Sequence, residues 1–77
     1  AHSLLIQWDP DGPIVQVPVG QFGDRAIEWL RTHAEQPGVV KLWAERNRFA
    51  LQEYWGRDKS GALALKKAVE PILAAAE

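Results

Sequence analysis

Cysteine and methionine are absent from this sequence of 77 residues, and histidine occurs only at His2 and His33. Without cysteine the chain can form neither a disulfide bond nor a thiolate metal site, and two separated histidines are too few for a zinc site. We therefore expect no metal and no other cofactor. Because the absence of cysteine also fits a reducing compartment, we expect a cytoplasmic protein.

Long hydrophobic runs are also missing. A membrane-spanning helix needs about 20 consecutive apolar residues, whereas the apolar stretches here are short and interrupted. The N-terminus lacks the basic-then-apolar pattern of a signal peptide. The chain begins with alanine, as it would after removal of an initiator methionine, so we expect a complete small gene product with no membrane partner.

What the sequence does contain is apolar and aromatic bulk. The composition is 47% hydrophobic and includes four tryptophans. A chain of this length buries roughly 60% of the surface that its unfolded form exposes, so its core must be thin. We expect one domain, residues 1–77, in which large aromatic side chains supply much of the buried area.

Charge is distributed unevenly along the chain. The net charge is −1, which argues against bulk electrostatic capture of nucleic acid. Residues 41–67 nevertheless hold seven cations and three anions, whereas residues 1–40 hold two cations and five anions. The middle of the chain is therefore the basic part.

The first nineteen residues predict a β-hairpin. Leu4, Ile6 and Trp8 alternate with Ser3, Leu5 and Gln7, which is the period of a strand. The segment DPDGP, residues 9–13, predicts a loop, and residues 14–19 alternate again. Pro18 has no amide donor and indicates an edge strand.

Residues 23–35 predict a helix. Apolar residues between Phe22 and Ala34 fall at helical spacing, and Asp24 lies near the positive end of the helix dipole. The segment QPG, residues 36–38, is expected to end this helix.

The segment KLWAERNRFALQEYWGRDK, residues 41–59, concentrates aromatic and basic side chains, and its alternation predicts a second hairpin. The strands are expected at residues 39–45 and 48–55, with a turn at Arg46 and Asn47. One face of this second hairpin is expected to lie in the core, where it would pack with Trp8 and Trp29. That face carries Val40, Leu42, Ala44, Phe49, Leu51 and Trp55.

The C-terminal segment predicts another helix, capped by Asp58 or Ser60. Its buried stripe is expected to consist of Leu63, Val69, Ile72, Leu73 and Ala76. Two interpretations of Pro71 are open: it kinks or restarts this helix, or it begins a second short helix.

The predicted order is therefore ββαββα. Neither hairpin would be stable alone. We expect an α+β fold with a four-stranded, mainly antiparallel sheet and two helices packed on one face.

No catalytic constellation is apparent, and we predict that the protein is not an enzyme. The only serines are Ser3 and Ser60, and His33 is expected to be a helix-end or core histidine. The segment DPDG resembles the start of a calcium loop but lacks the later ligands. No small-molecule substrate is evident.

Binding is the favoured function, because the uncovered face of the expected sheet would carry residue types that are common at interfaces. We expect a non-catalytic interaction module that binds a protein partner, or a second copy of itself, through a sheet face or edge. Such a short chain would suit a bacterial or phage accessory protein with a regulatory role. The predicted partner-binding residues are Lys41, Trp43, Arg46, Arg48, Gln52 and Tyr54.

Two alternatives accompany this prediction. Trp43 and Tyr54 could instead pack across the strands and bind nothing. The hairpin of residues 41–59 could also bind single-stranded nucleic acid by stacking bases on its aromatic side chains. The anions Glu45, Glu53 and Asp58 lie among the cations and weaken this second alternative.

Overall fold

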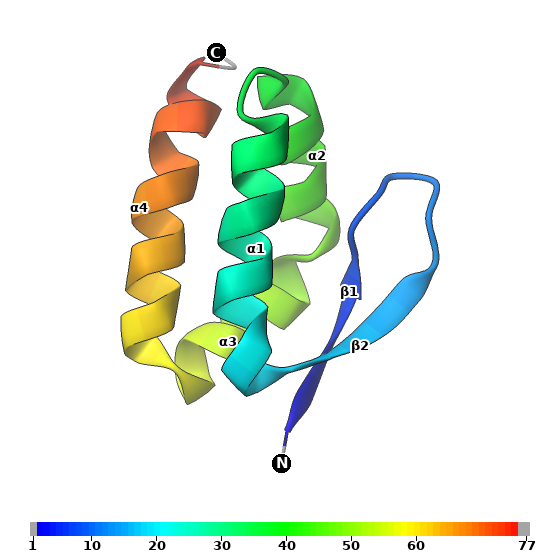
Figure 1. The fold of residues 1–77 in the computed structure, drawn as a ribbon, viewed down its shortest axis with the longest axis vertical. Coiled ribbons are helices and arrows are strands. Elements are labelled where there is room, and N and C mark those ends of the chain that lie inside the picture. The colour runs from blue at the N-terminus through cyan, green and yellow to red at the C-terminus, as the bar shows by residue number, and fades with distance from the viewer. Residues whose placement is uncertain (1, 76–77) are drawn as a thin grey trace.

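The computed structural model describes residues 2–75 and consists of one β-hairpin followed by four helices (Figure 1). The elements are β1 (Ser3–Gln7), β2 (Ile14–Pro18), α1 (Val19–His33), α2 (Pro37–Arg46), α3 (Arg48–Arg57) and α4 (Lys59–Ala75). The predicted four-stranded sheet with two helices is therefore wrong. The fold is a mainly helical α+β domain with the order ββαααα.

The N-terminal hairpin is confirmed. Strands β1 and β2 pair antiparallel, with Leu4 opposite Val17 and Ile6 opposite Val15. Leu4, Ile6 and Val17 are fully buried against the helices, as expected for one face of a strand pair. The side chain of Gln7 closes the loop by donating hydrogen bonds to the carbonyl oxygens of Pro10 and Gly12.

Helix α1 begins four residues earlier than predicted and ends two residues earlier. Pro18 has an extended backbone (φ −59°, ψ 140°), and the helix starts at the next residue. Its buried residues are Phe22, Ala26 and Leu30. Their four-residue spacing is the pattern that indicated a helix in the sequence.

The predicted second hairpin is wrong, because residues 39–46 lie in helix α2 and residues 48–55 lie in helix α3. Pro37 occupies the first turn of α2, where its missing amide costs nothing, so the segment that was expected only to end α1 also starts α2. Val40, Trp43 and Asn47 are buried on one side at spacings of three and four residues. A helical period was therefore present beneath the apparent alternation.

Helices α2 and α3 meet at Asn47, whose backbone (φ −102°, ψ 19°) leaves the helical region. The predicted turn at Arg46 and Asn47 is thus a break between two helices instead of a hairpin turn. Asn47 is buried, and its side chain bonds to the backbone of Gln7 in β1. The hairpin is fixed to the helices at this point.

Helix α4 is capped by Asp58, as predicted, through a 3.1 Å hydrogen bond from the amide of Gly61 to Oδ1 of Asp58. It continues through Pro71 to Ala75, so a separate helix starting at Pro71 does not form. The predicted stripe is correct in part: Val69, Ile72 and Leu73 pack on the core, whereas Leu63 is 43% exposed. Ala76 lies outside the described residues.

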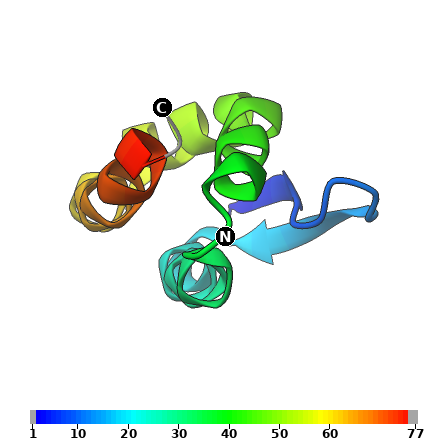
Figure 2. The ribbon, with the colours of Figure 1, turned by 90° about the horizontal axis from the view of Figure 1, so that it is seen from above.

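The core is built around stacked aromatic rings. The rings of Trp8 and Trp43 stack with centroids 6.1 Å apart, and those of Trp29 and Trp43 stack at 4.9 Å. Trp8 and Trp29 thus pack on the core as predicted, but Phe49 is 71% exposed and Trp55 is 39% exposed, contrary to prediction. Seen from above, the hairpin projects to one side of the helices (Figure 2).

Candidate functional site: an apolar groove between α2, α3 and α4

The residues predicted to bind a partner do not share one surface. Trp43 and Tyr54 are 2% and 1% exposed, because their positions in α2 and α3 face the core. Within the described residues 2–75, no open sheet face carries these aromatic side chains, so the geometry expected for the site is wrong. Lys41, Arg46, Arg48 and Gln52 are exposed.

The exposed basic residues lie in separate surroundings. Arg46 donates a hydrogen bond to the carbonyl oxygen of Pro10 and so joins the end of α2 to the hairpin loop. The guanidinium of Arg48 lies 4.9 Å from the ring centroid of Phe49. Lys41 and Arg48 both border a shallow depression that also contains Glu45. The structure thus brings two of the predicted cations together, beside an anion.

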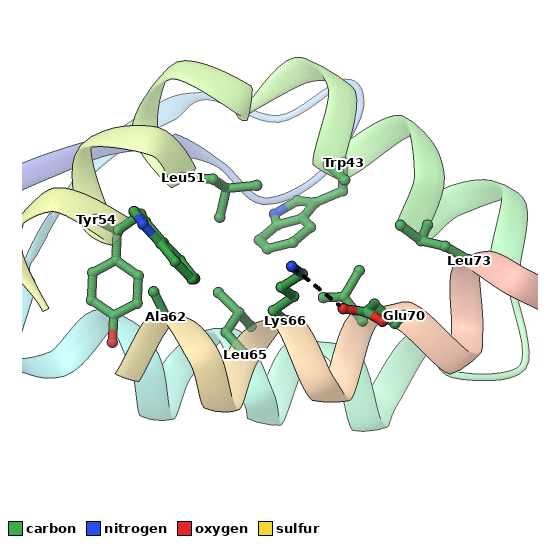
Figure 3. A pocket seen from close by; sticks show the side chains of 11 residues that line it. Trp43, Leu51, Tyr54, Ala62, Leu65, Lys66, Glu70 and Leu73 are labelled. Atoms are coloured by element: carbon green, nitrogen blue, oxygen red, sulfur yellow. Dashed lines mark ion pairs between the residues drawn. The ribbon is translucent and has the colours of Figure 1, made fainter. Parts of the chain in front are cut away.

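A different surface feature stands out: an apolar groove of about 320 Å³ between α2, α3 and α4 (Figure 3). All but two of the side chains that line it are apolar or aromatic. They are Trp43, Ala44, Leu51, Tyr54, Trp55, Ala62, Leu65, Lys66, Val69, Glu70 and Leu73. Along α4 the lining extends from Ala62 to Leu73, which is about 16 Å at the rise of an α-helix.

The groove has an apolar floor and a charged rim. The indole of Trp43 points into it from α2, opposite Leu65 of α4 (Figure 3). At the rim, Nζ of Lys66 lies 3.9 Å from the carboxylate of Glu70 and 5.9 Å from the ring centroid of Trp55. Lys66 and Glu70 are both 62% exposed, so this ion pair contributes little stability and can be exchanged for other partners.

One end of the groove is fixed by Tyr54. Its ring lines the groove, while its hydroxyl points away and donates a 3.0 Å hydrogen bond to Oδ2 of Asp58 (Figure 3). Burial, this hydrogen bond and the negative charges of Asp58 and Asp24 together raise the pKa of Tyr54 to about 12. The hydroxyl is therefore a neutral structural donor at physiological pH.

The groove offers surface for binding but few groups for chemistry. Within residues 2–75, its lining contains no histidine or serine, and its titratable groups are Tyr54, Lys66 and Glu70. The described part of the chain also has no cluster of three metal-ligating side chains. What the arrangement can do is remove apolar side chains from water.

A second aromatic surface lies near the end of α1. His33 stacks on Trp29 with centroids 4.2 Å apart, and its Nδ1 is 2.8 Å from the carbonyl oxygen of Trp29. This places His33 at a helix end, half-buried beside the core, as predicted. Among residues 2–75, the indole nitrogens of Trp29 and Trp43 have no hydrogen-bond acceptor. His33 and Trp29 line a shallow hollow together with Trp8, Arg25, Glu28 and Thr32.

Sequence reasoning missed the groove because it assigned residues 39–55 to strands. A signal was present in α4: Ala62, Leu65, Val69 and Leu73 recur at three- and four-residue spacing, which is a helical stripe. The opposite walls could not be foreseen, since they require α2 and α3 to be helices.

Comparisons with protein-family models, with curated proteins and with solved structures found no match to this chain. Among the described residues, no helix combines the length and the apolar character needed to cross a membrane.

Proposed function

We propose that this protein binds an amphipathic helix of a partner protein in the groove between α2, α3 and α4. The observation that carries the proposal is the apolar lining contributed by three helices, in which the charged side chains among the described residues, Lys66 and Glu70, lie at the rim. A helix that lays its apolar face into such a groove is a common mode of peptide recognition.

The composition of the groove favours a helix over a small polar molecule. Small-molecule sites combine apolar walls with a few polar groups that converge on the ligand and orient it. In this groove the hydroxyl of Tyr54 is engaged with Asp58, and Lys66 and Glu70 lie at the opening. Apolar anchors from a partner would find matching surface here.

The shape and charge of the rim suggest which helix would fit. The lining runs for about 16 Å along α4, or roughly three helical turns, so the partner needs apolar residues at i, i+3 or i+4, and i+7. Lys66 and Glu70 lie one turn apart. A partner helix with one acidic and one basic residue beside its apolar stripe could pair with both.

The alternative of single-stranded nucleic acid binding is supported less well, because only Phe49 and Trp55 of the aromatic side chains in residues 41–59 are exposed. Trp43 and Tyr54, the other two aromatic side chains of this segment, are buried and cannot stack on bases. Salt dependence distinguishes the two functions, because an oligonucleotide complex weakens steeply between low and physiological salt. Binding of an apolar helix should change little.

The test is a selection from a displayed library of amphipathic helical peptides with randomised apolar positions. We expect enrichment of peptides with the i, i+3 or i+4, i+7 pattern, and their binding should perturb NMR signals of Trp55, Lys66 and Val69. No enrichment, or perturbations confined to other surfaces, would contradict the proposal.

A matched pair of variants in α3 locates the binding. Trp55 and Phe49 are both exposed aromatic residues of this helix, but only Trp55 lines the groove. Trp55→Ser should weaken peptide binding about tenfold or more, as truncation of an interface anchor does. Phe49→Ser should leave the affinity for the peptide unchanged. Equal losses of affinity in the two variants would contradict the assignment of the binding site to the groove.

A further inference from the structure

The hairpin has one occupied edge and one free edge. On the β1 side, Asn47 receives the amide hydrogen of Gln7 and donates to its carbonyl oxygen. Beyond the outer edge of β2, Figure 2 shows no described element. The hairpin therefore ends in a strand that has a partner on only one side.

The pairing pattern shows which backbone groups face outward. The amide of Val19 donates to the carbonyl oxygen of His2, so residues 2 and 19 form a hydrogen-bonded pair. Such pairs alternate along an antiparallel ladder, which makes Leu4–Val17 and Ile6–Val15 hydrogen-bonded as well. The backbone groups of Ile14 and Gln16 then point away from β1, and within residues 2–75 they have no hydrogen-bond partner.

This free edge is short and only partly protected. Native edge strands are shielded by lysine, proline, bulges or a covering element. Residues 14–17 of β2 contain no charge and no proline, and Ile14 and Val15 are 66% and 36% exposed. Pro18 protects only the end of the strand that leads into α1.

We propose that β2 pairs antiparallel with β2 of a second copy, with the twofold axis beside Val15, so that two hairpins form one four-stranded sheet. In this register Ile14 of each copy exchanges both backbone hydrogen bonds with Gln16 of the other. A strand that pairs antiparallel with itself is self-complementary, as a twofold dimer requires.

The position of Pro18 argues against the neighbouring register on the side of α1. If the axis lay beside Gln16, Pro18 would stand opposite Ile14 of the second copy, where an amide donor is needed and proline has none. With the axis beside Val15, the new hydrogen bonds join Ile14 of one copy to Gln16 of the other, and Pro18 takes part in none of them. The two Val15 side chains then face each other across the axis as a non-hydrogen-bonded pair.

The dimer should be weak and depend on concentration. Two five-residue strands bury less than the roughly 1,600 Å² of a standard stable interface. The surface is separate from the helical groove, because none of residues 14–18 lines that groove. Self-association and peptide binding can therefore succeed or fail independently.

Single cysteines test the register, since the chain has none of its own. Opposed residues in a non-hydrogen-bonded pair have Cα atoms about 4.5 Å apart, within disulfide range, whereas diagonal residues lie beyond about 7 Å. Under mild oxidation, Val15→Cys should form a disulfide-linked dimer much faster than Gln16→Cys. Leu63→Cys, on exposed α4 surface, gives the rate of chance collisions.

Each outcome of the cross-linking experiment is decisive. Fast cross-linking of Val15→Cys alone supports both the edge and the register. Faster cross-linking of Gln16→Cys overturns the register, and equal rates in all three variants overturn pairing through β2.

Removal of one backbone donor provides the second test. Gln16→Pro deletes the outward amide but no hydrogen bond to β1, and Gln16→Thr retains that amide as its control. In sedimentation velocity, the parent chain and Gln16→Thr should shift toward dimer as concentration rises, whereas Gln16→Pro should remain monomeric. If circular dichroism shows Gln16→Pro to be unfolded, Ile14→Lys replaces it, because an edge lysine also blocks pairing. A parent chain that stays monomeric at every concentration, or a folded Gln16→Pro that still dimerises, overturns the proposal.

Discussion

The side chain of Asn47 pairs with the backbone of Gln7 as a neighbouring strand would. Its Oδ1 accepts the amide hydrogen of Gln7 at 2.9 Å, and its Nδ2 donates to the carbonyl oxygen of Gln7 at the same distance. Nδ2 also donates to the carbonyl oxygen of Trp43 in α2. One buried side chain therefore satisfies the edge of β1 and ends a helix.

Asn47→Leu should lower the free energy of unfolding by about 2–4 kcal/mol, because it leaves part-buried backbone groups of Gln7 unpaired. Asn47→Asp should cost at least as much at neutral pH, since a carboxylate oxygen would face the carbonyl oxygens of Gln7 and Trp43. Urea denaturation measures both losses. Gln52→Glu, on the exposed side of α3, is the control and should change stability by less than about 0.5 kcal/mol. A similar small change in Asn47→Leu would refute the bridging role.

The hairpin and α1 were predictable because their signals are local. Leu4 and Ile6 alternate with polar or exposed positions, and proline and glycine end the strand within a few residues. In α1, Phe22, Ala26 and Leu30 repeat at helical spacing over two turns. Each pattern can be recognised without knowing where the rest of the chain lies.

Residues 39–55 were not predictable in the same way. The β-branched pair Val39–Val40 and the alternating large residues after it favour a strand, while Pro37 and the spacing of Val40, Trp43 and Asn47 favour a helix. What decides between them is non-local, because Asn47 bonds to Gln7, forty positions away. The groove could not be predicted for the same reason, since α2 and α3 form two of its walls.

Two glycines make room for the hydroxyl of Tyr54 between α1 and α4. A Cβ atom at Gly23 would lie 2.6 Å from that oxygen, and one at Gly61 would collide with both Tyr54 and the carboxylate of Asp58. A Cβ atom at Gly20, also in α1, would meet nothing within 4 Å. The need for glycine is thus specific to the positions that face Tyr54.

Gly23→Ala should destabilise the protein by about 1–3 kcal/mol through overpacking. Gly20→Ala should be neutral or stabilising by up to about 1 kcal/mol, because alanine favours a helix. Tyr54→Phe removes the oxygen that collides, so the double variant Gly23→Ala/Tyr54→Phe should lose less than the two single losses combined. Thermal and urea unfolding of the four proteins measure this coupling, and strict additivity would argue against the packing described.

Tyr54 should make stability fall at alkaline pH. Burial, the hydrogen bond to Asp58 and two nearby carboxylates raise its pKa to about 12, whereas an unfolded tyrosine titrates near 10. Below pH 10 both states keep the proton. Between about pH 10 and 12 only the unfolded state releases it, so the free energy of unfolding declines by up to about 1.4 kcal/mol per pH unit.

Because Tyr54 is the only tyrosine, phenolate absorbance follows it directly. The titration midpoint of the folded protein should lie near 12, and Asp58→Asn should lower it by removing a negative charge. Lysine side chains also titrate at alkaline pH, and Tyr54→Phe separates their contribution from that of Tyr54. In this variant the free energy of unfolding should decline less between about pH 10 and 12 than in the parent protein. A midpoint near 10 in the folded protein would contradict the buried hydrogen bond.

Phe49 and Trp43 should differ sharply in their contributions to stability. A β-hairpin would bury Phe49 and expose Trp43, whereas the helices place Trp43 in the aromatic stack and leave Phe49 71% exposed. Trp43→Ala should therefore cost about 3–5 kcal/mol, or leave the chain unfolded, because it opens a cavity beside Trp8 and Trp29. Phe49→Ala should cost less than about 1 kcal/mol, since it loses only surface contacts such as that with Arg48. Urea denaturation measures both losses. Unfolding should be detected by far-ultraviolet circular dichroism, because removal of Trp43 changes the tryptophan fluorescence itself. The reverse order of losses would favour strands over helices for residues 39–55.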